Sequence, residues 1–361
     1  MKTGRVTPIF FAIVSVGIMA ISGISQETPP TQDEQARIWK ARLKEYPPWK
    51  ISKELDFLFS FPDEELASGD IYLWQAHNID CDADGNIYVT DQKQRCLFKF
   101  DGRGRFLLKK GREGQGPGDF LNPYSLDVSG KTVYVADTIK RDIQVFDQKL
   151  DLVRSFKTLR SYTNIAVGAD GRIFATPFRL SADMPLVDVL DERGVLQYSF
   201  GQPLAGNAKQ WTVPNFVHLD IDGRGQVLLA YWHLATVCRY SAKGELLAVH
   251  QLDHKGMKEA EKFNRDRMDV PDNRVFRVAI YGLRAKEDGF FVLHNYPITE
   301  VLELDADGKP VNGFWVARSQ DYFALDFVVR EAAEPGGKEI LLMQGGGGSQ
   351  VDVFRPKKKR P

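Results

Sequence analysis

Four of the six histidines in this chain fall next to predicted strand ends, where imidazole could do chemistry. His77 and His218 come just before two predicted strands, and His233 and His294 follow two others. Imidazole titrates near neutral pH, so it can act as a general acid or base, and in its neutral form it is a common zinc ligand. None of these histidines forms a close pair such as His-x-His. A divalent metal is therefore a minor option, and no cofactor is predicted.

Other polar and aromatic residues precede predicted strands at comparable positions. With two of the histidines they form a predicted ligand-binding ring: His77, Asn78, Tyr124, Asn164, His218, Arg277 and Tyr322. We expect this ring to bind a small molecule or a protein. No catalytic residue is assigned, because the chain has no Gly-x-Ser-x-Gly motif that would indicate a serine nucleophile.

The elements that must position the ring belong to a repeat. Each unit contains a strand, a turn with glycine, an aromatic-rich strand and two further strands. The third strands end at Phe100, Phe146, Leu190, Tyr240, Leu304 and Phe354, and the first strands are expected to begin near Ile79, Leu126, Ile165, Leu219, Val278 and Leu325. A period of roughly 50 residues with four short strands is typical of a β-propeller. The sequence therefore predicts an all-β fold, a six-bladed β-propeller with four-stranded blades. In such a ring, the residues before the first strands lie at one mouth of the central channel.

The last repeat has only three strands, so one strand is missing at the C-terminal end. The segment from Glu54 to Phe61 precedes the first blade and places Leu55, Phe57, Phe59 and Phe61 on one face. We expect it to complete the sixth blade and close the ring, because an open ring would expose edge strands that favour aggregation. The alternative is a separate strand that packs on an outer face.

The chain divides into three predicted regions. Residues 1–25 resemble a signal peptide, with Lys2 and Arg5 before an apolar core and small residues near the cleavage site. Residues 26–50 read as a linker with a short helix between its proline pairs, and residues 51–361 form the propeller. We expect an exported protein, periplasmic or extracellular, with no membrane span after signal cleavage.

Composition limits the partners. The 48 basic and 48 acidic residues balance, so no overall field attracts nucleic acid, and no nucleic-acid partner is expected. The basic C-terminal tail is interpreted as solvated.

Cys81, Cys96 and Cys238 are expected to be buried thiols. A disulfide between Cys81 and Cys96 is not expected, because the first and third strands of a blade are not neighbours. The protein is expected to be a monomer.

Two segments carry a family resemblance. Gly111 to Phe120, followed by Asn122-Pro123, is similar to the inter-blade loop of NHL-repeat propellers, and Val135 to Asp147 is similar to their strands. The chain thus resembles exported bacterial NHL-like six-bladed propellers, most clearly in its first two blades. Asp91 and Asp137, which end second strands, are interpreted as structural residues that bond backbone amides of their own turns.

The resemblance implies a fold more than a function, because propellers of this kind bind proteins, RNA or small molecules, or act as lyases and lactonases. We expect a ligand-binding or protein-binding scaffold that uses the channel mouth. The alternative is a metal-dependent lyase or lactonase at the same mouth, for which Asn78, Asn164, His77 and His218 are the available residues. The charged segment from Asp253 to Arg274 is expected to be either a lid over the channel or an exposed excursion.

Overall fold

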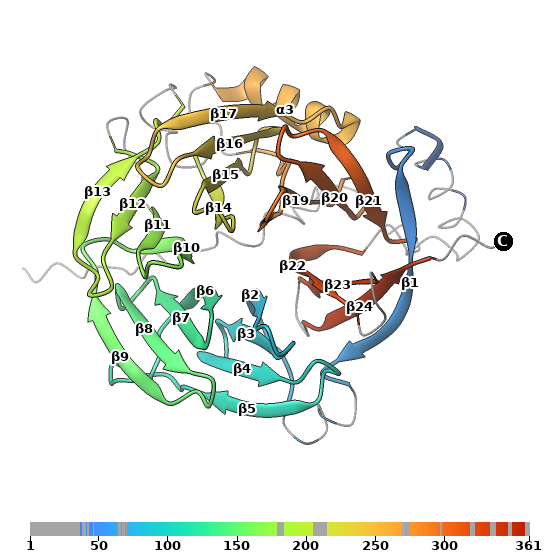
Figure 1. Ribbon diagram of the computed structural model, residues 1–361. Helices are drawn as coiled ribbons and strands as arrows, with labels where there is room; N and C mark the ends of the chain where they lie inside the picture. The colour runs from blue at the N-terminus through green and yellow to red at the C-terminus, as the bar shows by residue number, and fades with distance from the viewer. Residues whose placement is uncertain are drawn as a thin grey trace, which may run out of the picture.

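The computed structural model places six blades around a central channel (Figure 1). It describes residues 37, 41, 43–45, 47–63, 66, 69, 71–178, 184–204, 215–268, 270, 275–296, 298–317, 322–332, 337–345 and 349–357. The signal peptide assigned to residues 1–25 and the basic tail after Lys357 lie outside these residues. Within the linker, the described residues 37, 41 and 43–45 are helical, in agreement with the short helix expected there.

The first four blades are four-stranded antiparallel sheets whose strands follow one another in sequence. Blade 1 contains β2 (Ala76–Cys81), β3 (Ile87–Asp91), β4 (Cys96–Phe100) and β5 (Phe106–Lys110). Blade 2 contains β6 (Pro123–Ser129), β7 (Thr132–Asp137), β8 (Asp142–Asp147) and β9 (Leu152–Lys157). Blade 3 contains β10 (Tyr162–Val167), β11 (Ile173–Pro177), β12 (Val187–Leu190) and β13 (Leu196–Phe200). Blade 4 contains β14 (Val217–Ile221), β15 (Val227–Tyr231), β16 (Thr236–Tyr240) and β17 (Leu246–Gln251).

Blade 5 contains β18 (Gly282–Lys286), β19 (Gly289–His294), β20 (Glu300–Asp305) and β21 (Pro310–Trp315). Its first strand begins at Gly282, so the prediction of a start near Val278 was wrong. The preceding segment bonds to other elements: the Ala279 and Ile280 amides both donate to the Trp232 carbonyl, and the Arg277 amide donates to the Asn264 side chain. These contacts use the backbone donors that a longer β18 would have offered to β19.

Blade 6 contains β22 (Ala324–Glu331), β23 (Lys338–Gln344) and β24 (Val351–Pro356), and β1 (Ser52–Phe61) completes it. β1 pairs antiparallel with β24, from Leu55 opposite Pro356 to Phe61 opposite Val351, which confirms the predicted ring closure. The first residues of β1 also pair in parallel with β21. One eight-stranded sheet therefore joins blades 5 and 6, as the blue strand at the right of Figure 1 shows.

The second and third strands carry the core. Every residue of β3 and β4 is buried, because neighbouring blades cover both faces of these strands. The aromatic residues that mark the third strands, Phe100 and Phe146 among them, are fully buried between blades. Cys96 and Cys238 are buried free thiols as expected, whereas Cys81 is only half-buried and lies at the channel.

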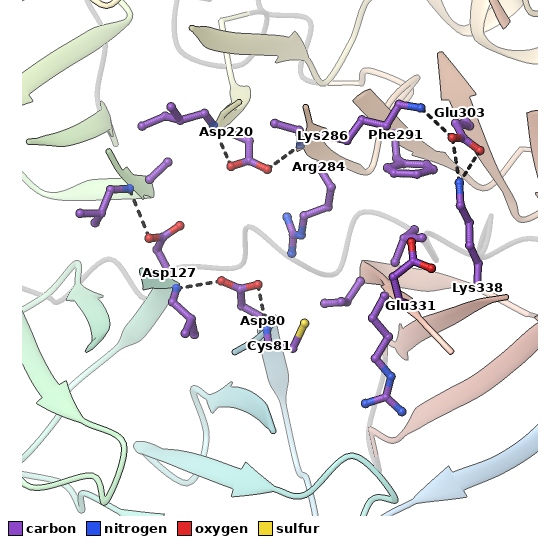
Figure 2. Close-up of a pocket in the computed structure, with 18 residues that line it drawn as sticks. Asp80, Cys81, Asp127, Asp220, Arg284, Lys286, Phe291, Glu303, Glu331 and Lys338 are labelled. Carbon is purple, nitrogen blue, oxygen red and sulfur yellow. Dashed lines mark hydrogen bonds and ion pairs between the residues drawn. The ribbon is translucent and has the colours of Figure 1, made fainter. Parts of the chain in front are cut away.

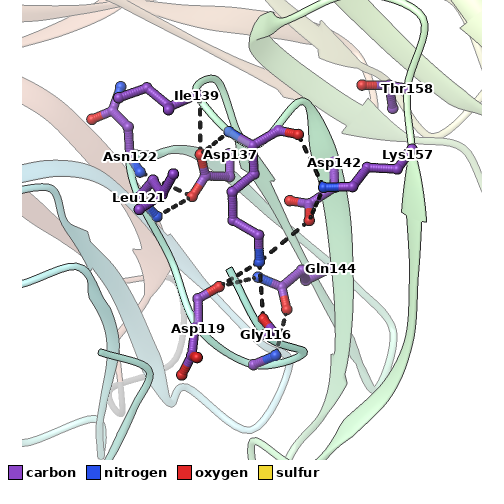
Figure 3. A network of polar contacts seen from close by, with 12 residues as sticks. Gly116, Asp119, Leu121, Asn122, Asp137, Ile139, Asp142, Gln144, Lys157 and Thr158 are labelled. Atoms are coloured by element: carbon purple, nitrogen blue, oxygen red, sulfur yellow. Dashed lines mark hydrogen bonds and ion pairs between the residues drawn. The ribbon is translucent and has the colours of Figure 1, made fainter. Parts of the chain in front are cut away.

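The aspartates that end the second strands are structural clamps, as predicted. Asp137 accepts hydrogen bonds from the Leu121 and Asn122 amides (2.6 and 2.9 Å) and from the Ile139 and Lys140 amides (3.0 and 2.9 Å), as Figure 3 shows. Its buried carboxylate therefore holds both its own turn and the loop that enters the same blade.

The charged insertion after β17 forms α3 (Lys255–Met268). Its residues Met257, Ala260 and Asn264 are buried, and Met257 and Ala260 belong to the apolar cluster between blades 4 and 5. In Figure 1, α3 lies at the rim of the ring and not over the channel. Of the two interpretations of this insertion, this position does not support the lid. Among the described residues, no helix has both the length and the apolar character that crossing a membrane requires.

Candidate functional site

The six inner strands β2, β6, β10, β14, β18 and β22 line the channel (Figure 1). Their registers place equivalent residues at the same height in each blade. We call the level near the start of the strands the upper level, formed by Asn78, Ser125, Asn164, His218, Gly282 and Asp326. The level two residues further along is the lower level, formed by Asp80, Asp127, Ala166, Asp220, Arg284 and Val328.

The structure places three residues of the sequence-predicted ring, Asn78, Asn164 and His218, at the upper level, and His77 and Tyr124 directly before it in blades 1 and 2. His77 packs against Tyr124 with ring centroids 3.9 Å apart, and its Nδ1 lies 2.6 Å from the Tyr124 carbonyl oxygen. Asn78 donates to Asp326 (2.5 Å) and accepts from the Leu126 amide (2.7 Å). His218 stacks on Trp232, with ring centroids 5.1 Å apart. Asn164 occupies the equivalent position on β10, where it is half-buried.

Arg277 and Tyr322 do not join this ring, so their inclusion is not supported by where they lie. The exposed Arg277 guanidinium lies 4.0 Å from the ring centroid of Phe263 on α3, because the segment before β18 follows that helix. Tyr322 packs edge-on against Phe354 in blade 6, with ring centroids 6.1 Å apart.

The four histidines singled out in the sequence, His77, His218, His233 and His294, are held as neutral imidazoles. Burial lowers the pKa of His77, His218 and His233 to about 4 and that of His294 to about 3. Each has a ring nitrogen near a backbone carbonyl, as in His233 with Arg277 (3.1 Å) and His294 with Ala279 (2.8 Å). Groups with such low pKa values do not change charge near neutral pH, so these contacts assign the histidines a packing role.

The lower level contains three aspartates that the sequence analysis did not select. Each accepts a hydrogen bond from the inner strand of the next blade: Asp80 from the Val128 amide (2.8 Å), Asp127 from Val167 (3.2 Å) and Asp220 from Ala285 (2.7 Å). The carboxylates thereby link adjacent blades around the channel. A signal was present, because Ile79-Asp80, Leu126-Asp127 and Leu219-Asp220 repeat an aliphatic residue followed by aspartate.

Arg284 supplies the positive charge of the lower level. Its Nη2 donates to both oxygens of Asp326 (2.8 and 2.9 Å) and to the Ile79 carbonyl (2.8 Å), and its side chain is 23% exposed. The guanidinium thus crosses between the two levels and is bonded to an upper-level carboxylate. Arg284 also lowers the pKa values of Asp80, Asp127 and Asp220, but only through its electrostatic field at longer range.

The pKa values of these three carboxyls reflect that imbalance. Burial raises the pKa of Asp80 to about 6, against the lowering effect of Arg284. Burial and repulsion from Asp80 and Asp220 raise the pKa of Asp127 well above its ordinary value, and burial also raises that of Asp220. The folded channel therefore disfavours full ionisation of its carboxyls.

A cavity of about 490 Å³ opens at the lower level (Figure 2). Asp80, Asp127, Asp220 and Arg284 point into it. The apolar residues Val128 and Ile221 are also among those that line it. The lining also includes Lys286, Phe291, Glu303 and Lys338 from blades 5 and 6, which we call the side arm. There Glu303 accepts from Lys286 (2.7 Å) and Lys338 (2.8 Å); burial alone would raise the pKa of Glu303, but these bonds lower it.

Within the described ranges, no three or more His, Cys, Asp or Glu side chains are arranged to hold a metal ion. Asp80 and Asp220 each accept two backbone N–H bonds, one on each carboxylate oxygen, so about half of their lone pairs are used and the others stay available to a ligand.

Asp127→Asn should change how stability depends on pH. A carboxyl whose pKa is higher in the folded than in the unfolded state binds protons more tightly when folded, so its contribution to the free energy of unfolding falls as pH rises between the two values. We therefore expect Asp127→Asn to become more stable relative to the wild type as pH increases from about 4 towards 8, measured by urea unfolding. Glu192→Gln, at an exposed turn of blade 3, is the control; a pH-independent difference for Asp127→Asn would contradict the assignment.

Comparisons with known proteins agree on the fold. A family model described as a 6-bladed beta-propeller, DUF5128, matches residues 68–163, which span blades 1 and 2. No curated protein matches this chain. A Bacteroides fragilis protein described as exported is 13% identical, with a TM-score of 0.57 and coverage of 85% of this chain and 99% of that one.

Two further solved structures are similar to this chain in fold at low sequence identity. The WD40 repeats of RRP9 have a TM-score of 0.51 and 10% identity, covering 84% of this chain and 100% of that one. A streptogramin B lyase has a TM-score of 0.50 and 11% identity, covering 83% and 87%. At such identities the likeness concerns the propeller fold alone.

Proposed function

We propose that the protein is a binding module that takes a small, positively charged organic ligand into its central channel. The observation that carries this proposal is the 490 Å³ cavity around Asp80, Asp127 and Asp220. The guanidinium of Arg284 lies nearby but is bonded to Asp326. A volume of a few hundred cubic ångströms is in the range of small-molecule sites in proteins.

Electrostatics favour a cation. Burial raises the pKa values of Asp80 and Asp127, and repulsion between carboxylates of like charge adds to this effect. A cation that enters relieves this repulsion and favours the ionised carboxyls. An ammonium group is well suited, because it carries one charge and several N–H donors that neighbouring carboxylates can share.

The walls favour an organic cation over a bare ion. Val128, Val167 and Ile221 line the cavity beside the aspartates and can contact a carbon chain. The side arm adds Phe291, with the Lys286 and Lys338 ammonium groups 5.5 and 5.1 Å from its ring centroid. A short aliphatic amine combines the charge and the apolar surface that this lining complements.

The proposal includes export to the periplasm or the cell exterior and membership of the NHL-like type. It is supported by the basic and apolar residues at the start of the chain and by the likeness to a protein described as exported. In the scaffolding form of this binding role, a protein partner binds at the upper mouth of the channel.

A metal-dependent lyase or lactonase is the alternative. The similar streptogramin B lyase supports it only through the fold, and the part of the chain that the structure describes contains no set of metal-ligating side chains. The carboxylates and neutral histidines of the channel favour the binding role.

Binding of amines tests the proposal. We expect putrescine, spermidine or agmatine to raise the melting temperature of the full chain and to bind in calorimetry, more tightly at pH 7.5 than at pH 5.5 because the carboxyls are then ionised. Asp127→Asn should weaken binding about 10-fold or more, the scale of one charge-assisted hydrogen bond. Glu192→Gln should bind like the wild type. If Asp127→Asn bound the amines as tightly as the wild type, or if the wild type bound none of the three amines, the result would argue against this site.

A further inference from the structure

We propose a second ligand site, a saccharide-binding platform formed by Tyr72 and Trp74 on the loop that enters blade 1. This platform lies outside the channel cavity, and the inference does not depend on the function proposed for that cavity. Trp74 is 47% exposed and Tyr72 37% exposed, which is unusual for two neighbouring aromatic side chains that could have packed inward. Their ring centroids are 6.3 Å apart, with an angle of 52° between the planes.

The loop holds these rings in fixed positions. Leu73, between them, is 1% exposed and belongs to the apolar cluster shared by blades 1 and 6. The buried Asp91 carboxylate accepts from the amides of Trp74 (2.6 Å) and Gln75 (3.0 Å). A platform anchored by its backbone loses little conformational entropy when a ligand binds, which favours affinity.

The same clamp occurs in blade 2 without the aromatic residue. There Asp137 accepts from the amides of Leu121 and Asn122, the equivalents of Trp74 and Gln75. The clamp therefore needs only backbone amides, and it does not explain why an indole stands at this position. An exposed tryptophan on a rigid loop points to a ligand contact.

The surroundings of the platform are polar and mostly neutral. Gln75 and Gln92 lie side by side (3.4 Å between Nε2 and Oε1), and the Gln94 side chain donates to the Tyr72 carbonyl. The Lys93 ammonium is 5.2 Å from the centroid of the Trp74 ring. Side-chain amides and an ammonium match hydroxyl groups, because amides both donate and accept hydrogen bonds.

A sugar ring combines the two features that this surface requires. The C–H face of a pyranose is apolar and lies flat on an aromatic ring, while its hydroxyl groups point outward to polar neighbours. A stable protein partner would instead need about 800 Å² of contact on each side, with a packed apolar centre. Two aromatic rings bordered by glutamines favour the saccharide.

The test is binding of defined oligosaccharides to the full chain. The probes are cellohexaose, xylohexaose, maltohexaose and chitohexaose, measured by calorimetry and by quenching of tryptophan fluorescence. We expect the wild type to bind at least one of them, and Trp74→Ala to bind it at least 10-fold more weakly. Tyr72→Ala should also weaken binding. Tyr296→Ala, which removes an aromatic ring of 41% exposure elsewhere, is the matched control and should leave binding unchanged.

Three results would overturn the proposal. The first is a wild type that binds none of the four probes, and the second is a Trp74→Ala variant that binds as well as the wild type. The third is a platform that binds hexaproline but no saccharide, which would assign it to a peptide partner. Circular dichroism and melting temperature confirm that each variant is folded, and since Trp74 is exposed, its removal should not disturb the core.

Discussion

Phe61→Ala should lower the free energy of unfolding by about 3–5 kcal/mol, the usual cost of truncating a buried phenylalanine. Phe61 ends the closing strand β1 and is 2% exposed, and its ring centroid is 5.0 Å from that of Phe100 in blade 1. Gly104 lies against it, where a β-carbon would come within 2.8 Å of Phe61. The ring thus joins the sixth blade to the first, so its loss weakens the closure of the propeller.

Urea unfolding followed by tryptophan fluorescence measures this effect. Phe57→Ala is the matched control, because Phe57 lies on the same strand but is 44% exposed. The register of β1 against β24 shifts between Phe57 and Phe59, so the prediction that Leu55, Phe57, Phe59 and Phe61 all share one face was wrong. We expect the control to cost less, since the Phe57 ring contacts Phe354 at its edge but is far more exposed than that of Phe61. Equal losses for the two variants would mean that β1 contributes through its backbone pairing and not through the packing of Phe61.

Arg284→Met should cost about 3–5 kcal/mol, the scale for leaving one member of a buried ion pair without its partner. The substitution leaves the Asp326 carboxylate, 7% exposed, beside Asp80 and Asp220 without the guanidinium. The variant with both Arg284→Met and Asp326→Asn should recover part of this loss, because it removes the uncompensated charge.

A double-mutant cycle in urea at pH 7.5 measures the coupling between Arg284 and Asp326. We expect the single variant Arg284→Met to be less stable at pH 7.5 than at pH 5, relative to the wild type, because protonation of the remaining carboxyls relieves their repulsion. Additive effects of the two substitutions would show that the ion pair does not hold the channel together.

The fold was accessible from the sequence because each blade is a local unit. An aromatic residue or a leucine lies at or near the end of each third strand, with a spacing of roughly 50 residues, and most neighbouring strands within a blade are joined by short turns. The closing role of β1 was also accessible, because the last repeat lacked one strand and Glu54 to Phe61 had no other partner. The start of blade 5 was not, because α3 and Trp232 determine which backbone groups before Gly282 are bonded.

The channel was decided by the tertiary structure. Each blade contributes one residue to a level, so Asp80, Asp127 and Asp220 come together only after the ring closes, although Asp127 lies 47 positions after Asp80 and 93 positions before Asp220. The sequence by itself determined the strand pattern, the six blades and the strand that closes them, because these depend on local alternation and turns. Only the tertiary structure places the carboxylates of Asp80, Asp127 and Asp220 near one guanidinium, that of Arg284, which is already bonded to Asp326. The reason is that the charge balance in a buried channel depends on distances between blades, which the sequence of one blade does not contain.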